Sequence, residues 1–154
     1  CKLEKDENQL KQLDKVIIES KNDIYNKVRA LVLKSEIILK TKKIEEITES
    51  DLLSLNVAYS YTFYQRLKPL LNQCHKLVWQ YWEQQNQFDQ LLNLFRYSSF
   101  VWRLCNDVDE ELKYVNILQS NSEFIGWYEN NKNNINSTYY NQRIFALFKT
   151  PTNS

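Results

Sequence analysis

The adjacent residues Cys74 and His75 have the greatest chemical potential in this chain, since a thiol beside an imidazole can act as a nucleophile or bind a metal ion. His75 is also the only histidine. A catalytic cysteine and histidine usually lie far apart in sequence and face each other in space, whereas adjacent residues of a helix point about 100° apart. Since His75 falls at the edge of an apolar helical stripe, we interpret it as a structural residue and predict no catalytic role for the pair.

The cysteines and acidic residues also fall short of a metal site. Closed structural zinc sites use four Cys or His ligands, and Cys74, Cys105 and His75 are too few. The acidic run at residues 107–111 lacks the central glycine of a calcium-binding EF-hand loop. An acidic run on an amphipathic helix is usually a solvated face, so we predict neither a metal site nor a cofactor.

Aromatic residues are concentrated between residues 59 and 102, and at helical spacing some of them must point away from a buried stripe. Tyr, Trp and Arg are enriched in the energetically important parts of protein–protein interfaces. We therefore predict that the exposed members of one set bind a partner protein: Tyr59, Tyr61, Tyr64, Trp79, Trp82, Tyr97 and Trp127. The alternative is that these rings fill a small helical core.

The overall composition indicates which elements position these side chains. The 154 residues are 43% hydrophobic and carry 20 Lys+Arg against 19 Asp+Glu, a balance that favours a folded chain and gives no electrostatic case for nucleic acid as a partner. The chain contains one glycine, Gly126, and two prolines, Pro69 and Pro151. Hairpins, sandwich turns and phosphate-binding loops need these residue types, so we predict an all-α fold and exclude a Rossmann fingerprint and a P-loop.

The spacing of apolar residues predicts a single-domain bundle of four to five helices with a long N-terminal helix. Over residues 9–40, apolar residues recur every seven positions, as at Leu10, Ile17 and Ile24. Further helices are expected at 51–84, 88–118, 122–130 and 137–149, with a break near Leu67–Lys68 caused by Pro69. No internal repeat stands out at the periods of solenoid proteins.

The start of the chain suggests where the protein works. Residues 1–8 read as an N-terminal tether, residues 9–150 as the helical bundle domain and residues 151–154 as a C-terminal tail. A first residue Cys1 followed by a polar, charged stretch resembles a bacterial lipoprotein after removal of its signal peptide. That resemblance implies a lipid on Cys1 and a place in the bacterial cell envelope, periplasmic or surface-exposed. No run of residues is long and apolar enough for a transmembrane helix.

The two remaining cysteines bear on the same question. Cys74 and Cys105 form an even pair that an oxidising compartment could join in a disulfide. Both lie on apolar helical stripes, where a buried free cysteine is a common core residue. The bridge is therefore one of two open interpretations.

Together these patterns predict a lipid-anchored, extracytoplasmic helical protein that binds another protein, as an adaptor, an inhibitor or an immunity or exclusion factor. We predict no enzymatic activity. Two alternatives stay open. The first is a secreted eukaryotic or viral helical signalling protein, for which the glycosylation sequon at Asn136 counts. The second is a small enzyme that uses acidic residues such as Glu83, Asp107 and Asp109.

Overall fold

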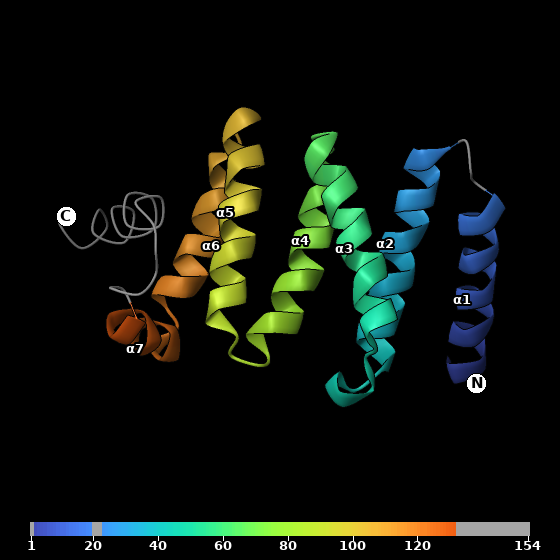
Figure 1. The fold of residues 1–154 in the computed structure, drawn as a ribbon, viewed down its shortest axis with the longest axis horizontal. Helices are drawn as coiled ribbons and strands as arrows, with labels where there is room; N and C mark the ends of the chain where they lie inside the picture. Colours follow the sequence, from blue (N-terminus) through green and yellow to red (C-terminus); the bar gives the residue numbers. More distant parts are fainter. Residues whose placement is uncertain (1, 20–22, 132–154) are drawn as a thin grey trace. The chain divides into compact units, whose positions relative to one another are not determined.

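The computed structural model describes residues 2–19 and 23–131. Over these residues the secondary structure is helical, with no strand (Figure 1). The elements are α1 (Lys2–Glu19), α2 (Ile24–Thr41), the 3-10 helix η1 (Ile44–Glu46), α3 (Glu49–Tyr64), α4 (Lys68–Glu83), α5 (Phe88–Leu104), α6 (Val108–Gln119) and α7 (Ser122–Asn131). The all-α prediction is confirmed for this part of the chain, whereas the prediction of four to five helices is wrong, because the described residues alone form seven α-helices.

The higher count arises because polar residues begin new helices inside two segments that were expected to be continuous. The predicted helix 9–40 divides into α1 and α2, and the Asp23 side chain caps α2 by accepting the Asn26 amide at 3.1 Å. The predicted helix 88–118 divides into α5 and α6, and the Asp107 side chain caps α6. The expected break near Leu67–Lys68 separates α3 from α4, and α7 confirms the short helix at 122–130. The predicted helix at 137–149 lies outside the described residues.

Three of the connecting turns share one backbone conformation and recur at a fixed interval. Arg66, Asn86 and Asn106 have φ angles of 54°, 53° and 56°, in the left-handed region, and are 20 residues apart in sequence. In each turn the amide of the next residue donates to the carbonyl five residues earlier, at 2.9, 3.1 and 2.7 Å. This is the hydrogen bond of a Schellman motif, which satisfies the last carbonyl groups of a helix.

The same interval governs which side chains are buried. His75, Phe95 and Val115 occupy equivalent positions and are each at most 1% exposed. Equivalent buried residues at two further positions are Leu71, Leu91 and Glu111, and Cys74, Leu94 and Tyr114. Residue identity does not repeat, in agreement with the sequence analysis, yet the geometry of these three turns and the burial of these positions recur every 20 residues.

The chain divides into two compact units, residues 1–81 and residues 82–154, called here unit 1 and unit 2. The predicted domain boundaries at residues 8 and 150 stay predictions. The helix α1 runs through residue 8 without a break, and residue 150 lies outside the described residues. No helix of the described residues is long and apolar enough to cross a membrane.

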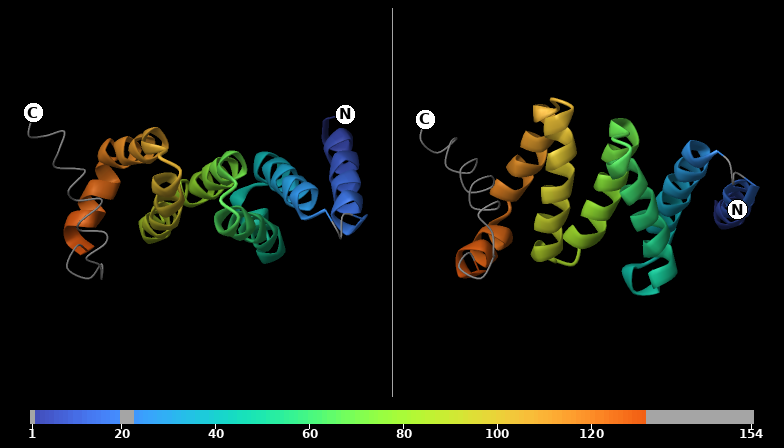
Figure 2. Two further views of the ribbon diagram at one scale, coloured as in Figure 1. Left: turned by 90° about the horizontal axis from the view of Figure 1, so that it is seen from above. Right: turned by 45° about the horizontal axis from the view of Figure 1, so that its top comes forward.

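In unit 1, α2 packs against both α1 and α3. Lys34 of α2 joins Asp14 of α1 at 2.6 Å, and the buried residues of α2 include Val28, Val32 and Ile38. Seen from above in Figure 2, α2 and α4 lie side by side and α3 lies to one side of them. Unit 1 therefore has a layer formed by α1, α2 and α4, with α3 packed against it.

In unit 2, the core is rich in aromatic rings. Trp102 of α5 stacks on Tyr114 of α6, with ring centroids 5.6 Å apart and planes 7° from parallel. Phe88 of α5 meets Phe124 of α7 edge-on at 5.6 Å. Trp102, Phe124, Tyr114 and Phe88 are all buried, so part of the aromatic content does fill a helical core, as the alternative interpretation supposed.

Candidate functional site

Four of the predicted partner-binding residues lie in unit 1. Tyr59 and Tyr61 are half-buried on α3, and Tyr64 at the end of that helix is 77% exposed. Trp79 of α4 is only 3% exposed and stacks on the buried His75, with ring centroids 5.5 Å apart. The prediction was limited to exposed members of the set, and Trp79 is not one of them.

The other three predicted residues lie in unit 2. Tyr97 of α5 is 52% exposed. Trp82, at the end of α4, is half-buried. Trp127 of α7 is also half-buried and contacts the rings of Phe88 and Phe124 at centroid distances of 5.8 and 6.0 Å. Tyr97 is therefore the predicted residue of unit 2 that presents most of its ring to solvent.

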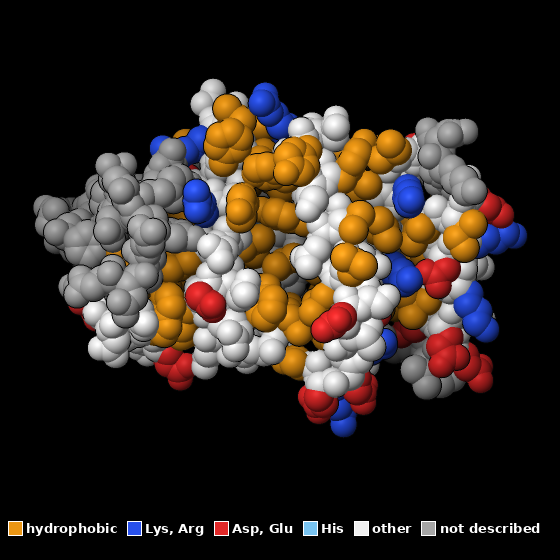
Figure 3. All heavy atoms as spheres, in the orientation of Figure 1, with side chains coloured by type: hydrophobic (Ala, Val, Ile, Leu, Met, Phe, Trp, Pro, Cys, Tyr) orange, Lys and Arg blue, Asp and Glu red, His pale blue; other side chains and the backbone are white. Residues whose placement is uncertain are grey.

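Tyr97 belongs to an apolar surface that sequence reasoning missed, because the predicted set contained Tyr and Trp alone. On α5, Tyr97, Phe100 and Leu104 follow the helical spacing i, i+3, i+7 and are each about half exposed. On α6, Val108 and Leu112 follow at i, i+4 and are also exposed. We call these five residues the α5–α6 face. Figure 3 shows hydrophobic side chains at the surface over α5. The two helical stripes were the signal that could have identified this face from the sequence.

A buried carboxylate fixes the two helices of this face relative to each other. Glu111 of α6 is 4% exposed and accepts hydrogen bonds from the Ser99 hydroxyl and from Arg103 of α5, at 2.9 Å to Nε and 3.1 Å to Nη2. The bidentate pair with Arg103 is the strongest geometry for a carboxylate. Ser99, Arg103 and Glu111 form what we call the Glu111 clamp.

The clamp also determines where the apolar residues point. Since α5 and α6 run in opposite directions, with Ser99 and Glu111 on the facing sides, the stripe of Tyr97 and Phe100 and the stripe of Val108 fall on the same side of the pair. The half-exposed Arg103 guanidinium lies between them. The arrangement presents aromatic, aliphatic and guanidinium groups on one rigid surface.

A second apolar surface lies on α3 in unit 1. Leu55 and Ala58 are buried, yet Leu53, Val57 and Tyr64 on the outward side are exposed. Hydrophobic side chains over α3 are visible in Figure 3. A helix that is apolar on both sides departs from the amphipathic pattern of a surface helix. The described contacts include no buried polar clamp that would hold this surface rigid, so the α5–α6 face is the stronger candidate for a binding surface.

The Cys74 thiol is buried and the Cys105 thiol is half-buried. Burial raises the pKa of Cys74 to about 12, and the Thr62 side chain opposes this shift weakly through a hydrogen bond. A thiol that stays protonated at neutral pH is a poor nucleophile. Cys74 and the half-buried Cys105 are both free thiols and belong to different units, so a bridge between them stays a prediction that thiol labelling can test.

The acidic residues considered for catalysis cap a helix or lie on helices at the surface. Asp107 is the N-cap of α6 and accepts the Glu110 amide at 3.4 Å, while Asp109 is exposed in the first turn. Glu83 is half-buried at the end of α4. Within the described residues, no group of three or more His, Cys, Asp or Glu side chains could hold a metal ion.

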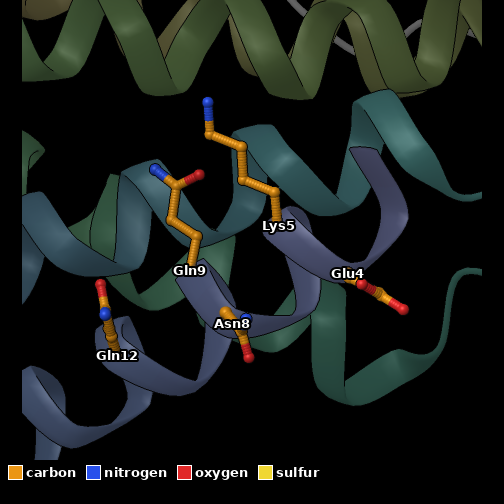
Figure 4. A pocket seen from close by; sticks show the side chains of 5 residues that line it. All are labelled: Glu4, Lys5, Asn8, Gln9 and Gln12. Atoms are coloured by element: carbon orange, nitrogen blue, oxygen red, sulfur yellow. The ribbon is translucent and has the colours of Figure 1, made fainter. Parts of the chain in front are cut away.

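Open hollows occur on unit 1. One of about 540 Å³ lies over α1 and is lined by Glu4, Lys5, Asn8, Gln9 and Gln12 (Figure 4). All five side chains come from one helix and none is a hydrophobic residue, whereas ligand sites are lined mainly by hydrophobic and aromatic side chains. Two further hollows on the same unit lie between helices, and leucine and isoleucine side chains form part of their lining.

Comparison of the chain with protein families, with curated proteins and with solved structures gives no significant match. The function therefore has to be argued from the geometry of the described residues.

Proposed function

We propose that this protein is a helical binding module that contacts another protein through the α5–α6 face. The single observation that carries the proposal is the union of exposed apolar side chains with a buried clamp that holds their two helices in place. A preorganised surface binds more tightly than a flexible one because less conformational entropy is lost on association.

The size of the face is appropriate for the central part of an interface. Burying the exposed half of five side chains of this kind contributes about 5 kcal/mol before the costs of association are subtracted. Aromatic residues together with Arg103 are the residue types that dominate binding energy in protein interfaces. The near-balanced charge of the chain adds no general attraction for nucleic acid. A partner with its own apolar surface is therefore the best match.

The experiment is a pull-down with the intact chain, comparing two pairs of substitutions of similar exposure. Phe100→Ser with Leu104→Ser removes apolar side chains from the α5–α6 face, and Leu53→Ser with Val57→Ser removes them from α3. Circular dichroism verifies that both variants are folded. We expect a partner that the wild type and the α3 variant retain and that the α5–α6 variant loses. A partner retained by both variants would show that the binding surface is elsewhere.

Lipid attachment to Cys1 and a place in the bacterial envelope stay predictions of the sequence, because Cys1 lies outside the described residues. Intact-mass measurement of the protein from its native cell tests them directly. A diacyl or triacyl adduct on Cys1 would support the membrane anchor, and an unmodified Cys1 would remove it.

A further inference from the structure

The two hollows between helices of unit 1 adjoin each other. One, of about 400 Å³, lies between α1 and α2 and is lined by residues that include Asp6, Gln9, Leu33 and Ile37. The other, of about 310 Å³, lies between α2 and α4 and includes Leu39, Gln73, Lys76, Leu77 and Gln80. Both are lined by Glu36 and Lys40 as well, so the two hollows form one surface, called here the α1–α2–α4 groove.

The ridge between the hollows is a single ion pair. Lys40 Nζ lies 2.9 Å from Glu36 Oε1, one helical turn away on α2, and the two side chains are 72% and 40% exposed. An exposed pair of this kind contributes only about 0.3–0.5 kcal/mol to stability. A bound ligand could therefore displace either side chain at little cost, and the ridge does not divide the groove into separate sites.

The walls and floor of the groove differ in chemistry. Leu33, Ile37, Leu39 and Leu77 provide apolar surface. Gln9 of α1 and Gln73 and Gln80 of α4 contribute exposed amides on the helices to either side of α2. A Gln side chain carries both a donor and an acceptor, as a peptide group does. A lining with apolar surface flanked by such amides can contact both the side chains and the unpaired main-chain groups of an extended polypeptide.

The charges argue for the same class of ligand and give it a direction. Glu36 and Lys40 neutralise each other at the centre, while Asp6 lies on α1 at one end and Lys76 lies on α4 at the other. The lining carries two acidic and two basic side chains, so it offers no field for a polyphosphate or nucleic acid. It is complementary to a ligand with a basic group near Asp6 and an acidic group near Lys76.

We propose that the α1–α2–α4 groove binds an extended peptide with a basic residue at one end, an acidic residue at the other and apolar residues between them. Packed helices lie about 8–10 Å apart, so a path across three helices is about 16–20 Å long. At about 3.3 Å per residue, an extended segment of roughly six residues spans it. This site is separate from the α5–α6 face and does not depend on it.

The probe is a synthetic library of hexapeptides, acetylated and amidated so that their ends carry no charge, screened against the full chain. The expected result is enrichment of peptides with opposite charges at the two ends. Lys76→Glu should weaken the binding of such a peptide roughly tenfold, since it replaces an attraction with a repulsion. Replacing the acidic residue of the peptide by lysine should restore binding to the Lys76→Glu variant.

Lys15→Glu is the matched control, because it makes the same charge change at an exposed position of α1 that lines neither hollow. An equal loss of affinity in Lys15→Glu and Lys76→Glu would overturn the proposal, as would a library with no enriched sequence. Loss of the peptide in the Phe100→Ser, Leu104→Ser variant would also overturn it, because it would assign the peptide to the α5–α6 face instead.

Discussion

Removal of Arg103 should destabilise unit 2 more than removal of any exposed ion pair of the chain. Arg103→Ala removes the guanidinium from the Glu111 carboxylate, whose side chain is 6% exposed and which still accepts the Ser99 hydroxyl, so a buried charge loses the counterion that Arg103 supplied. Breaking a buried ion pair from one side costs about 3–5 kcal/mol. Because the Arg103 side chain itself is 42% exposed, we expect the lower end, about 3 kcal/mol.

Glu111→Gln separates the charge from the packing. Glutamine keeps the shape of the side chain and one acceptor for Ser99, so its cost should be smaller, about 1–2 kcal/mol. The double variant, Arg103→Ala with Glu111→Gln, should then be less destabilised than the sum of the two single variants, since the uncompensated charge is gone.

The assay is urea unfolding followed by far-ultraviolet circular dichroism, with hydrogen exchange to locate the loss of protection. Lys40→Ala is the control, because it breaks the exposed Glu36–Lys40 pair and should cost about 0.5 kcal/mol or less. The loss of protection in Arg103→Ala should centre on α5 and α6. If Arg103→Ala and Lys40→Ala unfold at the same urea concentration, the clamp does not hold the two helices together and the proposed rigid face loses its basis.

Three further predictions concern burial, backbone conformation and pH. Trp102→Ala should lower the free energy of unfolding by about 3–5 kcal/mol, whereas Phe100→Ala, at a position 54% exposed, should change it by about 0.5 kcal/mol or less in the same urea titration. Arg66→Gly should raise the free energy of unfolding by about 0.5–1 kcal/mol, and with it the thermal midpoint, because glycine adopts the left-handed conformation without strain. Asn86→Gly should leave the free energy of unfolding nearly unchanged. Since burial raises the pKa of Cys74 from 9.0 to about 12, the unfolded state loses this proton first as the pH rises. Stability measured by urea titration should then fall above pH 9, by up to roughly 1.4 kcal/mol per pH unit, and Cys74→Ala should flatten this slope.

The fold class could be predicted from what the sequence lacks. With one glycine and two prolines, the chain could not supply the turns of a β-rich fold, and the described residues are helical. Helix boundaries were harder to predict, because Asp23 and Asp107 are ordinary polar residues in a periodic pattern and become N-caps only where the chain turns. Apolar periodicity continues through such a turn when both helices pack on the same core.

The 20-residue repeat escaped prediction for a related reason. Packing specifies that a position is buried, and residues as different as His75, Phe95 and Val115 satisfy that requirement. The left-handed turn is formed by Arg66 and by two asparagines, so no glycine marks it in the sequence.

The candidate site could be predicted in part. Tyr97 was identified from its residue type, whereas Phe100 was left out because only Tyr and Trp were chosen. Leu104, Val108 and Leu112 were missed because exposure of aliphatic residues depends on where two helices meet. The Glu111 clamp could not be predicted, since the acidic run at 107–111 reads as a solvated helix face and only the position of α5 shows which of its carboxylates is buried.

The equal spacing of Arg66, Asn86 and Asn106 has a consequence for how this chain tolerates changes in length. Insertion of a whole 20-residue segment would add one helix and one turn and leave every downstream side chain on its original face. Insertion of two residues within a helix would rotate all that follows by about 200° and expose what is now interior. Duplication or loss of whole 20-residue segments is therefore the route by which such a chain could grow or shorten while remaining folded.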